Sequence, residues 1–488
     1  MPFARREFLA AAAATAWLTA CSDDAGPTSN APASSTGSRL DSQSGSTSTS
    51  DRGVRADALD TAARDAGVSD AALPQPTAAL ITRWRQDPFA RGSYSYLAAG
   101  SSPSDRDALR ADVSERLFFA GEATSSDYPA TVHGALLEGR SAAERIMDKA
   151  DEDDEIAIIG AGIAGLAAAR TLTDEGYAVF VLEARDRLGG RMYTDDSLGF
   201  PVDLGAAWIH GASGNPLLDL VEAADVETRV TDEDDVVFYD AQGGTGDDDD
   251  LEEVVAALEE LSGNGDADST LGELIADALE DADDDTVELA TYAFTSLVEH
   301  EYAAPVADLS VRAVEEGEEF GGDELTFPTG YASLLTPLTN GVSITTGQIV
   351  ERIALAEDDV VIGGAGGAEL RTDRVLVTVP LGVLQAGGIE FVPALPAEKL
   401  TAIDSLGMGL LDRVVLQFEE RFWDDADVIG FVGNEPGVFV EWYDLTEQVG
   451  TPVIVGFNAA DVADDLALKT DEEVIATAMR ALVTMYGS

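Results

Sequence analysis

The sequence predicts an α/β protein in which a Rossmann-like domain is joined to an α+β domain built on a mixed sheet. Two observations support this prediction. Residues 155–183 hold a strand, a GxGxxG turn, a helix and a second strand in that order, which is the start of a βαβ unit. Acidic stretches, of which 251–261 and 271–279 have the apolar spacing of helices, and further short apolar strands follow between residues 231 and 488. They indicate a second layer with its own sheet.

The glycine-rich turn is the most informative motif. The apolar strand 155–159 leads into the turn, and the strand 177–182 ends at Glu183. Gly160, Gly162 and Gly165 would allow a tight turn, close approach of the backbone to a pyrophosphate, and close packing of helix on strand. Glu183 lies where an acidic side chain meets a ribose hydroxyl. The sequence therefore predicts a dinucleotide site at this turn.

The composition is strongly acidic. Among 488 residues, 92 Asp and Glu oppose 29 Lys and Arg, which gives a formal net charge of −63. Nucleic-acid binding through counter-ion release needs a basic face, so this charge excludes it. Screening is needed to tolerate such self-repulsion, and we interpret the acidity as adaptation to high salt. The alternative is an acidic surface that gathers a cationic substrate.

The N-terminus resembles an export signal. Arg5 and Arg6 precede an apolar run too short to span a bilayer, and the run ends at Cys21 in a sequence similar to a lipoprotein cleavage box. Residues 22–66 have the composition of a flexible linker. We therefore expect residues 1–21 to be a twin-arginine-type lipoprotein signal and the protein to be extracellular and anchored to the membrane through a lipid on Cys21. With one cysteine and three histidines, no Cys/His metal site is expected.

The residues after Glu183 resemble the flavin-containing amine oxidase family. The run 183–191, EARDRLGGR, is similar to the extended FAD motif of that family, and 203–211, DLGAAWIHG, is similar to the stretch that follows it. Further family motifs occur at 376–384, 391–396 and 406–411. Motifs at 84–96 and 117–135 are most similar to those of polyamine oxidases and lysine-specific histone demethylases.

Two of the family's C-terminal motifs stand at the front of this chain. They are 84–96, WRQDPFARGSYSY, and 117–135, which contains FFAGEAT. The resemblance thus implies a circular permutation, which is tolerated where termini are exposed and close together. The expected division is 67–148, the permuted segment; 149–230, the FAD-binding βαβ unit; 231–325, an acidic helical substrate domain; 326–385, a return to the FAD domain; and 386–488, the substrate-domain sheet and helix.

The resemblance assigns the cofactor-binding residues, and the cofactor it implies is FAD. Glu122 would bind the ribityl–pyrophosphate region. Backbone N–H groups of Thr131 and Val132, at a helix start, would stabilise the reduced flavin ring. Further contacts to FAD would come from Arg185, Gly190, Arg191, Ala207, Trp208 and the backbone of Val350. FAD is expected to be noncovalent, because the single cysteine lies in the signal region.

The resemblance also places three residues at the reacting centre. Tyr94 matches the wall tyrosine beside the flavin, whereas Thr131 stands where monoamine oxidases have a second tyrosine, which favours the polyamine-type branch. Arg413 stands where the family has a lysine near flavin N5. An arginine keeps the charge but is bulkier and does not release its proton, so this departure concerns the reaction with O2 above all.

The function implied is oxidation of a primary or secondary (poly)amine by hydride transfer to flavin N5, with O2 reduced to H2O2. The small-molecule amine and O2 are the expected partners. Two alternatives remain: an amine dehydrogenase that passes electrons to a membrane acceptor, and a flavin-bound surface protein without turnover.

Overall fold

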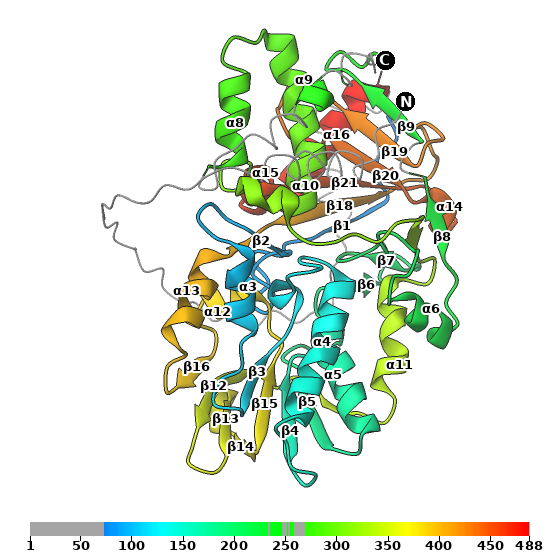
Figure 1. The fold of residues 1–488 in the computed structure, drawn as a ribbon. Helices are drawn as coiled ribbons and strands as arrows, with labels where there is room; N and C mark the ends of the chain where they lie inside the picture. Colours follow the sequence, from blue (N-terminus) through cyan, green and yellow to red (C-terminus); the bar gives the residue numbers. More distant parts are fainter. Residues whose placement is uncertain (1–72, 233–234, 246–250, 252–253, 258–268, 488) are drawn as a thin grey trace, which may run out of the picture.

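The computed structural model describes residues 73–487 except 233–234, 246–250, 252–253 and 258–268. The expected signal, Cys21 and the linker lie outside the described residues. Figure 1 shows two bodies of sheet, with helices α4, α5 and α11 beside the lower sheet and α15 and α16 beside the upper one. Within the described part of the chain, no helix has both the length and the apolar character needed to cross a bilayer.

The lower body contains a five-stranded sheet in which every neighbouring pair is parallel. The strand order is β11 (Ser343–Thr345), β5 (Ala178–Leu182), β4 (Glu155–Ile159), β15 (Arg374–Val377) and β3 (Leu117–Phe119). The central strand β4 is buried from its second residue onward, as its continuous apolar sequence requires in a sheet covered on both faces. The Rossmann-like prediction is confirmed.

Two glycines let helices pack closely beside this sheet. Helix α5 (Ile163–Asp174) follows the glycine turn, and a Cβ at Gly165 would stand 2.1 Å from the carbonyl oxygen of Gly160. Helix α4 (Val132–Met147) packs on α5, and a Cβ at Gly139 would stand 2.1 Å from the carbonyl oxygen of Ala164. No side chain fits at either contact, so both glycines are needed for the packing.

The upper body is built on a six-stranded mixed sheet. Its order is β1 (Ala78–Ile81), β18 (Leu411–Gln417), β21 (Val453–Ala459), β20 (Glu441–Asp444), β19 (Val428–Phe431) and β9 (Val236–Tyr239). All pairs are antiparallel except β19 with β9. Helices α15 (Ala460–Ala467) and α16 (Asp471–Tyr486) follow β21. A smaller sheet of β14 (Glu369–Thr372), β13 (Val360–Gly364), β12 (Val350–Leu355) and β16 (Glu390–Val392) extends from the lower body (Figure 1).

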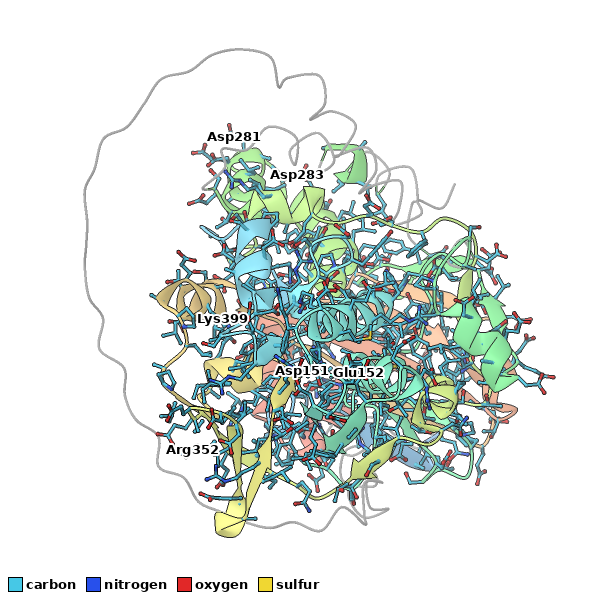
Figure 2. All side chains as sticks on the ribbon, turned by 60° about the horizontal axis from the view of Figure 1, so that its bottom comes forward. Asp151, Glu152, Asp281, Asp283, Arg352 and Lys399 are labelled. Carbon is cyan, nitrogen blue, oxygen red and sulfur yellow. The ribbon has the colours of Figure 1, made fainter. Side chains whose placement is uncertain are left out.

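The acidic stretch is helical only in part. The helix expected over residues 271–279 is confirmed as α8 (Leu271–Ala278), followed by α9 (Asp284–Phe294). The helix expected over 251–261 falls largely outside the described residues. The expectation missed strand β9, whose β-branched and aromatic residues favour a strand and pair with β19. Figure 2 shows Asp281 and Asp283, between α8 and α9, at an outer edge of the molecule, and Asp283 caps α9.

The front of the chain contributes to both bodies. Strand β1 pairs with β18, β2 (Ser95–Tyr96) pairs with β17 (Gly407–Met408), and β3 pairs with β15. Helix α3 (Pro103–Arg110) packs on α13 (Ala397–Ser405), where the buried ammonium of Lys399 donates hydrogen bonds to the carbonyls of Ala108 and Leu109. Residues 78–147 are therefore integral to the fold.

A chain that begins at Asp151 should not bind FAD. It lacks β1, β3 and α4, so one edge of each main sheet and one face of α5 are left uncovered. Purified protein should show no flavin absorption and should expose its tryptophans to quenchers. The control is a chain that begins at Gly67, which should be yellow. Normal FAD content in the shorter chain would contradict the prediction.

Candidate functional site

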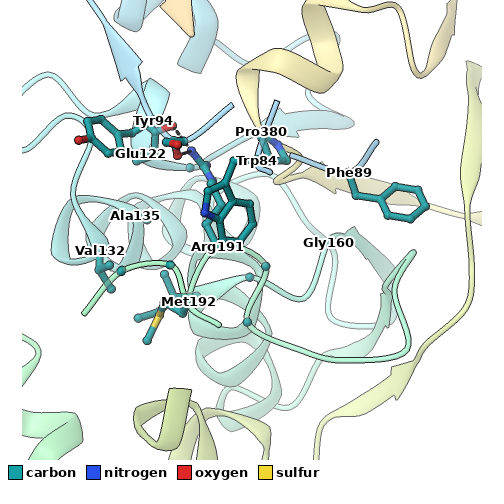
Figure 3. Close-up of a pocket in the computed structure, with 18 of the residues that line it drawn as sticks. Trp84, Phe89, Tyr94, Glu122, Val132, Ala135, Gly160, Arg191, Met192 and Pro380 are labelled. Atoms are coloured by element: carbon teal, nitrogen blue, oxygen red, sulfur yellow. Dashed lines mark hydrogen bonds and ion pairs between the residues drawn. The ribbon is translucent and has the colours of Figure 1, made fainter. Parts of the chain in front are cut away.

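A cavity of about 500 Å³ lies between the glycine turn and the six-stranded sheet. Its lining comes from the turn, the start of α4, the 203–211 segment, the front segment and strands β18, β20 and β21. Figure 3 shows Tyr94, Glu122 and Arg191 close together, with Phe89 some way from them along the cavity. The cavity therefore joins the predicted dinucleotide site to the predicted substrate wall.

The glycine turn leaves room for a ligand. Gly162 has an extended backbone and lines the cavity, and a Cβ built there would have the carbonyl oxygen of Gly189, 4.0 Å away, as its nearest neighbour outside the adjacent residues. Nothing in the fold therefore requires glycine at this position, unlike Gly165, which is enclosed by protein. A pyrophosphate that approaches the backbone closely does require it, so the turn fits a dinucleotide cofactor.

Glu183 lies at the end of β5 and is buried against the same turn. Its carboxylate accepts hydrogen bonds from the backbone N–H of Ala161 at 2.8 Å and of Arg185 at 2.9 Å. Each carboxylate oxygen can accept a further hydrogen bond, so the side chain can also receive a ribose hydroxyl. The turn and the acidic residue predicted to act together are therefore in contact.

Arg191 and Glu122 form an ion pair at the cavity, with 2.7 Å between Nη1 and Oε1 (Figure 3). The other carboxylate oxygen of Glu122 accepts a hydrogen bond from Ser95 Oγ at 2.6 Å, and Ser95 Oγ accepts one from Arg106 at 2.7 Å. Burial raises the pKa of Glu122, but Arg191, Ser95 and Arg106 together outweigh it and hold the pKa below its ordinary value. Glu122 is therefore a buried carboxylate that stays ionised.

Helix α4 begins at the cavity. Thr131 is its N-cap, and the Thr131 hydroxyl accepts a hydrogen bond from the N–H of Gly134 at 2.9 Å. Thr131, Val132 and His133 all line the cavity. The first N–H groups of a helix carry partial positive charge, so this end of α4 suits an electron-rich ligand.

Arg413 lines the cavity but is held by the backbone. Its two terminal nitrogens donate hydrogen bonds of 2.7 Å to the carbonyls of Asp203 and Gly205, and its guanidinium lies 4.8 Å from the ring centre of Phe457. Burial lowers the Arg413 pKa to about 10, with Asp203 opposing that effect. The side chain stays charged at neutral pH. A lysine ammonium does not reproduce the bidentate fork that fixes these two carbonyls.

An aromatic wall faces the cofactor end. Trp208, Tyr443 and Phe457 contact one another with ring centres 5.1 to 6.1 Å apart, and Tyr94 lines the same cavity. The indole Nε1 of Trp208 is buried and has no hydrogen-bond partner among the described residues. A buried orphan donor at a cavity wall is a group that a ligand can satisfy.

Sequence reasoning missed a second buried pair at the cavity, His300 and Glu441. His300 Nδ1 lies 3.2 Å from Glu441 Oε2, and both residues line the cavity. His300 follows a π-helical turn, Thr295–Glu299, a distortion that is frequent at functional sites. The available signal was a histidine within an acidic stretch that holds no Lys or Arg from residue 230 to 311.

The structure brings nearly all predicted site residues together. The cavity is lined by Tyr94, Glu122, Thr131, Val132, Gly160, Gly162, Glu183, Arg185, Gly190, Arg191, Ala207, Trp208, Val350 and Arg413. Gly165 does not line it and acts in packing instead. Within the described ranges, no group of three or more His, Cys, Asp or Glu side chains is arranged to hold a metal ion.

Comparisons with known proteins agree with this geometry. Residues 10–147 and 163–488 match the family model for flavin-containing amine oxidoreductases, so the chain belongs to that family and is an amine oxidoreductase with a flavin cofactor. It is 30% identical to polyamine oxidase 2 of Arabidopsis thaliana over 358 residues, which cover 68% of this chain and 72% of the relative. It is also 31% identical over 365 residues to a rice (Oryza sativa subsp. japonica) protein, lysine-specific histone demethylase 1 homolog 1, covering 68% of this chain and 42% of that protein.

The fold is also that of a solved family structure. Wild-type putrescine oxidase bound to putrescine aligns with a TM-score of 0.54 at 22% identity and covers 69% of this chain and 82% of that chain. This likeness confirms the flavin amine oxidase fold, with its Rossmann-like and substrate domains.

Gly162→Ala should weaken FAD binding at least tenfold and leave the fold intact. The fold has room for the methyl group, but the methyl group would occupy space needed by the pyrophosphate. The dissociation constant of FAD is measured by fluorescence titration, and the fold by thermal unfolding without FAD. Gly321→Ala, at a glycine with no atom within 4 Å of its Cβ, is the matched control. Unchanged FAD affinity in Gly162→Ala would argue against a cofactor at the turn.

His133 should make the protein less stable in mild acid. Burial lowers the His133 pKa to about 4, and the nearby His210 adds to this effect. Below pH 6.5 the unfolded chain binds the proton first, so stability is lost as the pH falls from 6.5 to 4, by about 3 kcal/mol for this group. His133→Phe, placed between the rings of Tyr128 and Phe320, should remove this loss. Free energies of unfolding of both proteins across this range give the difference; parallel curves would refute it.

Proposed function

We propose that the protein is an FAD-dependent amine oxidase that oxidises a primary or secondary (poly)amine and reduces O2 to H2O2. The observation that carries this proposal is that one cavity of about 500 Å³ is lined both by the dinucleotide turn and by the aromatic wall. A substrate at that wall lies next to whatever part of the cofactor reaches it. The family membership supports the amine as the group that is oxidised.

Different residues of the cavity would bind different parts of FAD. The glycine turn and Glu183 would hold the adenosine–pyrophosphate part, Arg191 and Glu122 the middle, and the start of α4 the flavin ring. When bound, the flavin supplies the acceptor for a hydride and the route of two electrons to O2. FAD would bind noncovalently and would not be linked to a cysteine side chain, because the only cysteine of the sequence, Cys21, lies in the expected signal region.

The wall provides orientation and excludes water. Amine oxidation needs an α-hydrogen held toward the acceptor, so a rigid aromatic surface contributes more than a nucleophile would. Thr131 at the place of a second wall tyrosine leaves room for a longer substrate. The names of the relatives, polyamine oxidases, and the putrescine bound to the solved neighbour support a (poly)amine as substrate.

A second candidate is an amine dehydrogenase with a membrane-bound electron acceptor. Arg413 motivates it, because its guanidinium is fixed by two backbone carbonyls in the cavity where the family has a lysine. A lipid anchor on Cys21, with the protein outside the cell, would bring such an acceptor within reach.

The chain order is part of the proposal. We infer that residues 67–148 are the family's C-terminal segment moved to the front, because they carry its motifs. The parallel pairing of β3 with β15 and the packing of α4 on α5 place that segment beside the dinucleotide turn. The ends that the permutation joins meet at the acidic loop of residues 149–154, where Figure 2 shows Asp151 and Glu152 side by side.

The oxidase should release peroxide when it is mixed with amine in air. Purified holoprotein is tested in high salt with putrescine, spermidine and butylamine, first without oxygen for bleaching of the flavin and then in air for H2O2. Bleaching with stoichiometric peroxide supports the oxidase. Bleaching without peroxide identifies the dehydrogenase, and no bleaching by any amine contradicts both. Free H2O2 added to the assay controls for its recovery.

A further inference from the structure

We infer that His300 and Glu441 form a dyad that removes a proton from the substrate ammonium before its α-carbon is oxidised. This inference rests on the proposed amine oxidation and adds a residue pair to it. The dyad lies at the substrate end of the cavity, on α10 (His300–Tyr302) and β20, and neither residue belongs to the cofactor motifs.

The hydrogen bonds of the dyad determine which imidazole nitrogen carries the hydrogen. Glu441 Oε2 accepts a hydrogen bond from Ser296 Oγ at 2.7 Å and lies 3.2 Å from His300 Nδ1. An ionised carboxylate only accepts, so Nδ1 carries the hydrogen and Nε2 presents its lone pair. That Nε2 is buried and has no hydrogen-bond partner among the residues that the structure describes.

The surroundings hold the dyad in place. The Tyr94 hydroxyl donates a hydrogen bond of 2.5 Å to the carbonyl of His300, so the predicted wall tyrosine is joined to the dyad. The side chains of His300 and Glu441 are 4% and 5% exposed. The dyad is therefore shielded from bulk water, and in the proposed step the partner of Nε2 is an amine bound in the cavity that both residues line.

The chemistry requires such an acceptor. A primary alkylamine has a pKa of about 10.4, so it reaches the cavity at neutral pH as an ammonium ion. Oxidation needs the neutral amine with its lone pair. In the proposed step an N–H bond of the ammonium breaks, its electron pair stays on the amine nitrogen, and the proton forms a bond to His300 Nε2. The imidazolium that results is compensated by the Glu441 carboxylate, which is the arrangement of a general base oriented by an acid.

Other charges act on His300 as well. The titratable or charged groups that adjoin the dyad in sequence, or contact it directly or through Phe457, are Tyr94, Glu299, Glu301, Arg413 and Tyr443. Further charged groups, among them Glu122, Arg191 and His210, line the same cavity. Arg413 opposes a second positive charge, and it lies against Phe457, as does His300. Glu441 is in direct contact with the imidazole and supplies the negative charge that compensates the proton accepted in the proposed step.

The test is the pH dependence of amine binding in the anaerobic half-reaction. The holoprotein is mixed with putrescine, spermidine or butylamine, and the amine concentration that half-saturates the rate of flavin bleaching is measured from pH 7 to 9. Wild-type protein accepts the ammonium form, so this concentration should change less than threefold. His300→Asn lacks the proton acceptor, so only the neutral amine binds productively. The neutral fraction falls about tenfold for each unit by which the pH is lowered, so the half-saturating amine concentration should rise about 100-fold from pH 9 to pH 7.

Controls separate the dyad from general damage. The control variant His210→Asn changes another histidine–glutamate pair. His210 lines the cavity, its Nδ1 lies 2.8 Å from Glu324 Oε2, and its side chain is 55% exposed. This variant should keep the wild-type slope. Glu441→Gln should shift the slope toward that of His300→Asn. His300→Gln serves as a second variant, and flavin absorption and near-UV circular dichroism report folding.

Two outcomes overturn the inference in distinguishable ways. Equal pH slopes in wild-type protein and both folded His300 variants would remove the dyad and leave the proposed oxidase intact. Failure of every amine to bleach the wild-type flavin would overturn the proposed function and the dyad with it. If neither His300 variant folds, a wild-type slope in folded Glu441→Gln overturns the dyad.

Discussion

The site depends on a relay of alternating charge whose members other than Arg191 are buried. Arg191 pairs with Glu122 at 2.7 Å, Glu122 is bonded through Ser95 to Arg106, and Arg106 pairs with Glu316 at 2.6 Å. The side chains of Arg106 and Glu316 are 1% and 4% exposed. Loss of one member would leave a charge buried without its partner, which costs about 3–5 kcal/mol. The relay therefore determines how three distant stretches of chain meet beside the cavity.

The relay joins the front of the chain to the rest of the site. Ser95, Arg106 and Glu122 belong to the front segment, Arg191 follows the dinucleotide motif, and Glu316 belongs to the substrate half. Hydrophobic burial and strand pairing place β1 and β3 in their sheets, but they do not select a unique position for a charged side chain. The ion pairs do so, because they are short and directional. The cavity thereby receives one wall from each part of the chain.

Two buried basic side chains of this acidic protein bind backbone carbonyls and not carboxylates. Arg413 and Lys399 each donate to two backbone carbonyls, and in both cases the cation fixes a segment near the end of another element. Lys399 is labelled in Figure 2; burial lowers its pKa to about 7, and it is not among the residues that line the cavity. The lysine expected beside the flavin is thus not replaced by this one. The proposed dyad of His300 and Glu441 adds a proton acceptor to a cavity in which Arg413 stands in place of the family's lysine.

The sequence by itself determined the local parts of this molecule. Glycine spacing, apolar strands and the acidic residue after β5 predicted the Rossmann-like unit, because each depends on neighbours within about 30 residues. The same local signals predicted α8 and three of the residues that line the cavity, and the family resemblance named eleven more. The composition and the motif order were likewise available from the sequence.

Tertiary structure alone decided the rest. Strand β9 lies in a stretch read as helical, and its parallel pairing with β19 joins residues almost 200 positions apart. In the sequence Glu441 is an ordinary strand residue, and only the fold shows that β20 brings it to His300. In the sequence Arg413 is a substitute for a lysine, and only the fold shows that its guanidinium binds the carbonyls of Asp203 and Gly205. These contacts depend on burial and on the relative position of sheets that no local pattern encodes. A carboxylate becomes a positioning or acid–base group only when the fold removes it from water and supplies its partner.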